Sequence, residues 1–412
     1  MADSPSNPIC RVLPLKLRRL PEDFQVAELT DFAASGGAFA LYRMSKRSIG
    51  TAEAIDEIAR RWHLPRHRIS YGGLKDRHAV TQQYVTIHNG RKQNLSEKNL
   101  ELCYLGQGDR AFTPHDIAGN RFTIVIRDLS SRAAAFAVEA LEAAARDGIP
   151  NYFDDQRFGS VGSSGEFIAR AWCRGDYERA LWLALADAHP DDRPEERIQK
   201  QILRDTWGRW VECKAKLDRS HRRSIVTYLA DKPPDRPDYR GAFSKLKVDL
   251  RGIYLAAFQS FLWNRMLSRY LRRAVPAERL TDVALQLDPV PFFTTLESAE
   301  RESLQANELP LPSARLHLDE GPMLALVQEV LAEVGLELRE LRVKYPRDSF
   351  FSKGSRKPVV PIANVSHDLA ADEIYDGRRK LRLSFELPRG AYATILVKRL
   401  TACGFKDDEP VP

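Results

Sequence analysis

A single carboxylate between two cations is the first feature of this sequence that could do chemistry. Asp76 lies between Lys75 and Arg77, in a short polar stretch that follows two glycines. Nearby positive charge favours the ionised form of a carboxylic acid, and an ionised aspartate can act as a nucleophile or a base. The alternative is that Asp76 caps a turn through its own backbone, as aspartate often does. Spacing alone favours this structural interpretation.

The residues around Asp76 predict a strand, a loop and a second strand. Ile69 and Tyr71 alternate with polar or small residues, and two glycines at positions 72 and 73 then interrupt the pattern, as a turn would require. From residue 79 onward a period of two returns. One face of this second strand would carry Ala79, Thr81, Gln83, Val85 and Ile87. The loop would therefore present Asp76 at the end of a sheet.

Other side chains in predicted strands have an ordinary structural explanation when only the pattern is considered. Asn120 and Phe122 are two residues apart in a predicted strand at 119–127 and so share a face. They are typical of a turn asparagine followed by a core phenylalanine. Phe24 follows the turn that Pro21 favours, and it is typical of a core aromatic.

Five stretches, in chain order, resemble motifs of the TruD family of RNA pseudouridine synthases. The stretch around Asp76 reads GGLKDRHAVTQQ at residues 72–83. The others are PEDFQVAEL at 21–29, GNRFTIVIRDLS at 119–130, PNYFDDQRFGS at 150–160 and LPRGAYATILVKRL at 387–400. One such match carries little weight, whereas five in the same order over both ends of the chain are specific.

The resemblance implies a role for each of six residues. Asp76 matches the catalytic nucleophile, and Arg18 matches the basic residue that pairs with that aspartate. Arginine can hold a carboxylate through two parallel hydrogen bonds. Asn120 would contact the uracil edge, because an amide both donates and accepts hydrogen bonds. The aromatic residues expected around the uridine are Phe24, Phe122 and Tyr392, the last at a position where the family usually has phenylalanine.

The resemblance also implies the architecture. We expect an α+β fold: a pseudouridine synthase catalytic core with a mixed, largely antiparallel sheet, interrupted by an inserted α/β TRUD domain. Residues 1–150 and 345–412 would form the core and residues 151–344 the insertion, with RNA in the cleft between them. Asp154 and Asp155 stand where the family has a glycine and a small residue.

The expected reaction is the isomerisation of a uridine in tRNA, at position 13 of the D-arm. The C–N glycosidic bond breaks, the uracil rotates in place, and a C–C bond forms at C5. The substrate supplies every atom of the product, so we expect no cofactor and no metal. Two rivals stay open: an RNA-binding module of the same fold without turnover, and a carboxylate-nucleophile hydrolase unrelated to RNA.

Composition is compatible with this function without proving it. The chain has 412 residues, enough for two domains, and a formal net charge of +7, which suits a polyanionic partner. Five scattered cysteines without a CxxC pair indicate a reduced compartment. We see no signal peptide and no run of about 20 apolar residues that could span a bilayer. A cytoplasmic monomer is therefore expected.

Helical periodicity predicts the remaining large elements. A helix at 51–62 would be capped by Thr51, and a second at 131–147 by a serine. A capping box at 163–166 predicts a helix that continues to about Ala188. Further helices are expected at 254–273 and 322–334, and a strand at 381–387. Residues 391–400 fit a strand or the start of a helix.

Two basic stretches are candidate RNA contacts. Arg265, Arg269 and Arg272 form an i, i+4, i+7 stripe, which is usually a solvated face but could contact phosphates. Residues 345–358 interleave basic and aromatic side chains, a pattern that suits single-stranded RNA and equally a surface loop.

Overall fold

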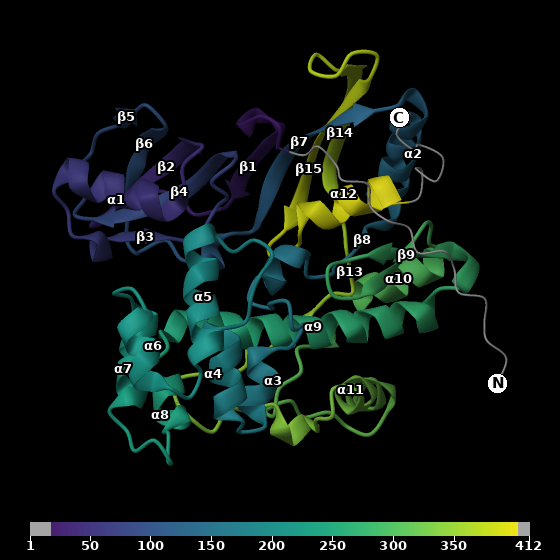
Figure 1. Cartoon of the computed structure of the whole chain (residues 1–412). Coiled ribbons are helices and arrows are strands. Elements are labelled where there is room, and N and C mark those ends of the chain that lie inside the picture. Colours follow the sequence, from purple (N-terminus) through teal and green to yellow (C-terminus); the bar gives the residue numbers. More distant parts are fainter. Residues whose placement is uncertain (1–17, 403–412) are drawn as a thin grey trace, which may run out of the picture.

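One large mixed sheet organises the fold (Figure 1). The computed structural model describes residues 18–402. In this range nine strands form the sheet, and β3 (Ile69–Tyr71) joins it through β4 alone. The other eight lie in the order β14 (Ala363–Ala371), β15 (Arg379–Pro388), β7 (Gly119–Leu129), β1 (Phe24–Leu29), β4 (Val80–His88), β2 (Phe39–Arg47), β6 (Leu100–Gly108) and β5 (Leu95–Glu97).

The strand directions confirm the predicted fold class. β1 and β4 run parallel, and the other pairs of this sheet run antiparallel. Segments from the first and last thirds of the described chain meet in the sheet, because β15 pairs with β7 and places Phe385 opposite Phe122. The expected α+β fold with a mixed, largely antiparallel sheet is thus observed.

Helices follow the first strands and fill most of the middle of the chain. α1 (Thr51–Trp62), α2 (Ser131–Asp147) and α12 (Ala393–Ala402) accompany the sheet. The helices between β8 and β13 are α3 (Ile168–Cys173), α4 (Tyr177–Leu185), α5 (Pro194–Thr206), α6 (Trp210–Lys216), α7 (His221–Ala230), α8 (Tyr239–Ser244), α9 (Val248–Ala274), α10 (Ser298–Ala306) and α11 (Pro322–Glu333). The 27-residue α9 runs through the middle of this group.

Short ladders join this helical part to the sheet part. β8 (Ile149–Pro150) pairs with β13 (Val359–Val360), and β11 (Leu309–Pro310) pairs with β12 (Ser355–Arg356). A hairpin of β9 (Leu280–Ala284) and β10 (Pro289–Phe293) follows α9. The chain therefore leaves the sheet and returns to it at neighbouring points.

Two apolar clusters form the core. The smaller one packs α1 on β2: Tyr42 and Met44 of the strand meet Ile55, Ile58 and Trp62 of the helix, all buried. These buried side chains form the apolar face of α1. The larger cluster extends from β7 and β15 to α9 and its neighbours, so the helical part packs directly against one half of the sheet.

Three expectations about helices need correction. The predicted helix at 163–188 is two helices, because Gly175 adopts a left-handed φ of 79° and Asp176 starts a new helix by accepting a hydrogen bond from Arg179 N. Ser164 does not begin a helix; its hydroxyl donates to Asp187 Oδ2 at 2.6 Å. Gly50, and not Thr51, is the N-cap of α1.

The other predicted elements are confirmed. The helices expected at 131–147 and 322–334 are α2 and α11, the one at 254–273 is the longer α9, and the strand at 381–387 lies within β15. The ambiguous stretch at 391–400 forms α12. None of the helices in the described part of the chain is long and apolar enough to span a lipid bilayer.

Candidate active site

All six residues singled out in the sequence line one cavity of about 260 Å³. They come from distant parts of the chain, and the wall is completed by neighbours of the same segments. The lining residues are Arg18, Phe24, Val26, Leu74, Lys75, Asp76, Asn120, Phe122, Gln156, Ala391, Tyr392, Ala393 and Thr394. A larger cavity of about 410 Å³ lies beside α9 and contains none of the six.

The fork in the sheet at β4 explains where the Asp76 loop lies. β2 pairs with the whole of β4 along one edge. The other edge is shared: β1 pairs with Val80, Thr81 and Gln82, and β3 pairs with Val85, Thr86 and Ile87. The loop leaves β3 and enters β4 beside the start of β1. Asp76 is therefore brought next to Phe24, the first residue of β1.

Arg18 contacts the Asp76 carboxylate directly. Its Nη2 donates to Asp76 Oδ2 at 2.9 Å, and its guanidinium lies 4.1 Å from the centre of the Phe24 ring. Both charged side chains are partly exposed, at 31% for Arg18 and 39% for Asp76. This contact is the pairing of Arg18 with Asp76 that the resemblance implies. It uses one carboxylate oxygen, so the second oxygen, Oδ1, is available to a substrate.

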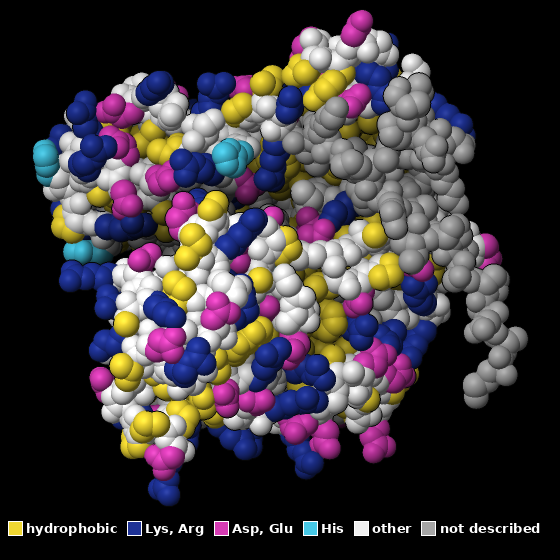
Figure 2. Space-filling model, in the orientation of Figure 1, with side chains coloured by type: hydrophobic (Ala, Val, Ile, Leu, Met, Phe, Trp, Pro, Cys, Tyr) yellow, Lys and Arg dark blue, Asp and Glu magenta, His cyan; other side chains and the backbone are white. Residues whose placement is uncertain are grey.

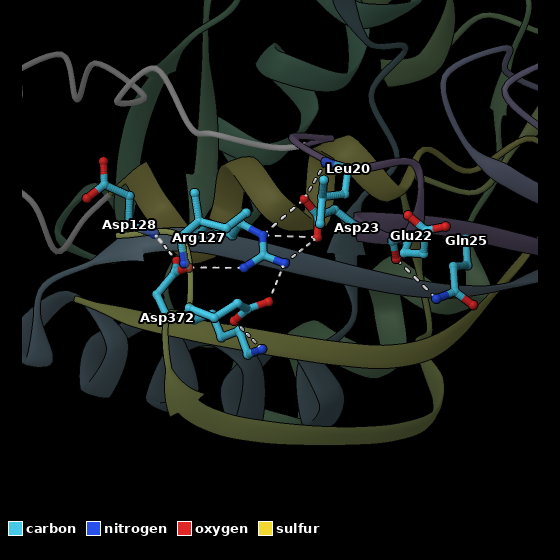
Figure 3. A network of polar contacts seen from close by, with 10 residues as sticks. Leu20, Glu22, Asp23, Gln25, Arg127, Asp128 and Asp372 are labelled. Carbon is cyan, nitrogen blue, oxygen red and sulfur yellow. Dashed lines mark hydrogen bonds and ion pairs between the residues drawn. The ribbon is translucent and has the colours of Figure 1, made fainter. Parts of the chain in front are cut away.

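A buried ion cluster fixes the turn that carries Arg18 and Phe24 (Figure 3). Arg127 on β7 donates to Asp23 at 2.9–3.0 Å and to Asp372 Oδ1 at 3.0 Å. Asp23 Oδ2 in turn accepts a hydrogen bond from Leu20 N at 2.8 Å. Buried charges cost free energy unless they are paired and hydrogen-bonded, and here they are. The cluster ties the turn to the sheet.

Lys75 links the Asp76 loop to Asn120. Its ammonium donates to Asn120 Oδ1 at 2.6 Å and lies 3.2 Å from Glu28 Oε1. Burial raises the pKa of Glu28, although Lys75 and the N–H of Tyr84 oppose this effect. Because an ammonium can only donate, the amide oxygen of Asn120 faces Lys75. Its NH₂ group is left for other partners in the cavity.

Tyr392 is held from the opposite side of the cavity. Its ring makes an edge contact with Phe153 at 6.1 Å, and the guanidinium of Arg356 lies 4.0 Å from the Phe153 ring. Arg356 also donates to Asn151 and to Gly390 O, close to Tyr392 in the chain. Burial lowers the pKa of Arg356 to about 10. Arg356 thus has a packing role rather than that of an exposed RNA contact.

Asp154 and Asp155 both form hydrogen bonds with the C-terminal helix. Asp154 accepts hydrogen bonds from Thr394 and Lys398, and Asp155 Oδ2 accepts from Lys398 at 2.7 Å. Both partners belong to α12, which begins directly after Tyr392. The two carboxylates therefore tie residues 154–155 to this helix.

Sequence reasoning missed several residues that shape the site. Glu28 is buried on the same face of β1 as Phe24 and Val26, and this alternation was the available signal. Gln156 and Thr394 line the cavity but follow no pattern that distinguishes them. Among residues 18–402, no group of three or more His, Cys, Asp or Glu side chains is arranged to hold a metal ion.

Comparison with known proteins identifies the family. Residues 13–400 match the family model described as tRNA pseudouridine synthase D. The chain belongs to the TruD family of tRNA pseudouridine synthases. The family and the enzyme class expected from the five motifs are thereby confirmed.

Individual TruD relatives match over nearly the whole chain. A probable tRNA pseudouridine synthase D 2 of Methanocaldococcus jannaschii is 31% identical and covers 93% of this chain and 91% of its own. A tRNA pseudouridine synthase D of Aquifex aeolicus is 27% identical and covers 94% of this chain and 98% of its own. The crystal structure of the putative TruD of Methanosarcina mazei has a TM-score of 0.72 at 25% identity and covers 95% of this chain and 94% of its own.

Proposed function

We propose that this TruD protein isomerises uridine 13 in the D-arm of tRNA, with Asp76 as the nucleophile. The observation that carries the proposal is that Asp76, Arg18, Asn120 and three aromatic side chains line one cavity. In this cavity the Asp76 carboxylate is oriented by Arg18 at 2.9 Å. A carboxylate held by a charge-assisted hydrogen bond is fixed in direction, as a nucleophile must be.

The cavity residues fit each step of such a reaction. Asp76 attacks the nucleoside, at the sugar or the base, and the bond between C1′ and N1 breaks. The uracil turns within the aromatic walls, and a bond from C1′ to C5 forms. The bond between Asp76 and the nucleoside breaks again, C5 loses its proton and N1 gains one. Substrate and product are isomers, so no co-reactant enters the balance. Phe24, Phe122 and Tyr392 would confine the uracil while it turns.

Asn120 is proposed to recognise the uracil by donating a hydrogen bond to it. Because its oxygen faces Lys75 at 2.6 Å, its NH₂ group is the part offered to a ligand. A uracil carbonyl accepts such a bond. This refines the expectation that the amide both donates to and accepts from the base.

We also propose that residues 1–150 and 345–412 form the catalytic core and residues 151–344 an inserted domain. The β8–β13 ladder supports this division, because it pairs residues 149–150 with residues 359–360 and so joins the two core segments beside the insertion. Gln156 belongs to the proposed insertion and lines the cavity, so RNA in the cleft would touch both parts. A monomeric, cytoplasmic protein stays a prediction.

The decisive experiment uses Asp76→Asn. Unmodified tRNA transcripts with uridine or cytidine at position 13 are incubated with protein, and pseudouridine is mapped chemically. We expect the wild type to modify only the first transcript. Asp76→Asn should lose turnover and bind tRNA within about threefold of the wild type, because an amide keeps the shape but loses the charge. Asp31→Asn, at an exposed aspartate outside the cavity, is the control.

Each outcome separates the candidates. Turnover near wild type in Asp76→Asn would refute the nucleophile. Modification at another uridine would refute the D-arm site and leave the chemistry intact. Absence of pseudouridine from both transcripts with the wild-type protein would refute uridine 13 of this tRNA as the substrate.

A further inference from the structure

A buried lysine outside the cavity holds the backbone of the Asp76 loop. Lys46 lies on β2 and is 2% exposed. Its ammonium donates to Asp76 O at 2.7 Å, to Ile49 O at 2.7 Å and to Lys75 O at 3.3 Å. The three donors of one ammonium are thus directed at three carbonyls, two of which belong to the Asp76 loop.

The position of Lys46 follows from the period of β2. Tyr42, Met44 and Lys46 alternate on the face of β2 that packs against α1, and all three are buried. An apolar residue would satisfy this packing at the end of the strand. A buried ammonium costs free energy unless it is fully paired. Packing alone therefore does not explain why a lysine occupies this position.

Two further buried side chains hold the same loop by its backbone. Thr51 Oγ1 accepts a hydrogen bond from Lys75 N at 2.9 Å and donates to Gln83 Oε1 at 2.9 Å. Gln83 Nε2 donates to Gly73 O at 3.1 Å. The loop is thus fixed at Gly73, Lys75 and Asp76, and Lys46 is the cationic member of this support.

We propose that Lys46 is a positioning residue of the reaction: its buried ammonium fixes the backbone at Lys75 and Asp76 so that the Asp76 carboxylate stays directed into the cavity. This inference rests on the proposed function of Asp76. Lys46 itself does not line the cavity and acts only through the loop.

The charge of Lys46 connects this role to pH. Burial lowers its pKa to about 8, while the negative charges of Asp76 and Glu53 act to raise it and the positive charge of Lys75 acts to lower it. Above pH 8 the folded protein holds a neutral amine at this position. One of the three donated hydrogen bonds and the attraction for Asp76 are then lost, so turnover should fall along an alkaline limb.

The test compares Lys46→Met and Lys46→Arg with the wild type in single-turnover experiments at saturating tRNA, from pH 6 to pH 10. Lys46→Met keeps the length of the side chain without donors. It should slow the chemical step about 100-fold, the effect of a misplacement of about 1 Å, with tRNA affinity within about threefold. Its residual rate should lack the alkaline limb near pH 8.

Lys46→Arg provides the second readout. Arginine keeps its charge over this whole range, so the limb near pH 8 should disappear while the rate at pH 7 exceeds that of Lys46→Met. Ionisation of the uracil itself affects all variants equally. Lys200→Met is the matched control, because Lys200 is also largely buried and bonded to a neighbour, Asp192 at 2.8 Å, but lies outside the Asp76 cavity.

Melting temperatures of all variants are recorded, and rates are expressed per folded molecule. If Lys46→Met does not fold, the pH profile of Lys46→Arg decides alone. A wild-type rate in Lys46→Met, or an alkaline limb unchanged in Lys46→Arg, overturns the inference. Absence of pseudouridine with the wild type would instead refute the proposed function, so the two failures are distinguishable.

Discussion

Phe122 shows that one side chain can belong to the site and to the core. It lines the cavity, yet it is only 8% exposed. Its ring stacks on Phe385 at 5.5 Å with an interplanar angle of 22°, and it meets the edge of Phe24 at 6.3 Å. Phe122 therefore lies both in the cavity wall and in the apolar core, the two positions that the sequence left open.

We predict that Phe122→Leu and Phe385→Leu have similar effects on stability and different effects on rate. Each should lower the free energy of unfolding by about 1 kcal/mol, since the replacement is apolar and of similar volume. Loss of base stacking costs about 1–3 kcal/mol, so Phe122→Leu should lower kcat/KM about tenfold. Phe385 lies behind Phe122 and does not line the cavity, so its variant should stay within about threefold. Urea unfolding and single-turnover rates would test this, and equal rate losses would contradict it.

At the scale of elements, the hairpin of β14 and β15 fixes the position of the turn at residues 18–23. Asp372, between the two strands, accepts hydrogen bonds from Arg127, Asp128 N and Ile374 N, at 2.9–3.0 Å. Arg127 then reaches Asp23. Residues more than 200 positions apart are thus joined in one buried cluster, and the turn that carries Arg18 depends on it.

We predict that Asp372→Asn destabilises the protein in a pH-dependent way. Burial alone would raise the pKa of Asp372, but the N–H groups of Asp128 and Ile374 and the Arg127 guanidinium outweigh it, so the pKa is lowered from 3.8. A carboxyl group whose pKa is lowered by folding stabilises the folded protein at pH values above its ordinary pKa. This stabilisation is lost as the pH falls through the lowered pKa. Breaking a buried pair costs about 3–5 kcal/mol.

Urea unfolding at pH 7 and at pH 3 measures this effect. The difference between wild type and Asp372→Asn should be large at pH 7 and smaller at pH 3. Asp376→Asn, at an exposed aspartate in the same turn, should change neither value by more than about 0.5 kcal/mol. A pH-independent difference would show that Asp372 acts by shape rather than by charge.

At the scale of the whole molecule, the net charge of +7 is not concentrated where the sequence suggested. Figure 2 shows Lys and Arg interspersed with Asp and Glu over the visible face. The arginine stripe of α9 is paired: Arg265 with Asp288 and Glu333, Arg269 with Glu333, and Arg272 with Asp282. These ion pairs favour a structural role for the stripe, and its contact with phosphates stays a prediction.

We predict that two pairs of substitutions separate structural cations from RNA contacts. Arg265→Gln with Arg269→Gln should lower the melting temperature and leave the salt dependence of tRNA binding unchanged. Lys353→Gln with Lys357→Gln, at exposed positions, should reduce the slope of log K against log salt by about one unit for each lost phosphate contact. Binding measured between low and moderate salt would test this, and a reduced slope for the arginine pair would restore the original interpretation.

The local pattern of the sequence predicted most of the elements, whereas the six candidate site residues came from the family resemblance. Alternation predicted the strands on both sides of Asp76, and apolar spacing predicted α1 and α2, because both signals depend on neighbours within one turn or one strand. Five of the six candidate residues lie within the matched motifs and Arg18 lies just before the first, and all six line one cavity. Their catalytic roles stay predictions.

The tertiary structure decided the features that depend on contacts between distant residues. The forked edge of β4 brings Asp76 beside Phe24, and the Lys75 ammonium determines which way the Asn120 amide faces. The sequence pattern singled out no role for Lys46, and only the tertiary structure shows that it is buried and donates to Asp76 O. Residue type and spacing determine which chemical groups a chain can present. The fold determines which partner each charged side chain contacts. That partner decides whether the charged side chain orients a catalytic loop or contacts RNA.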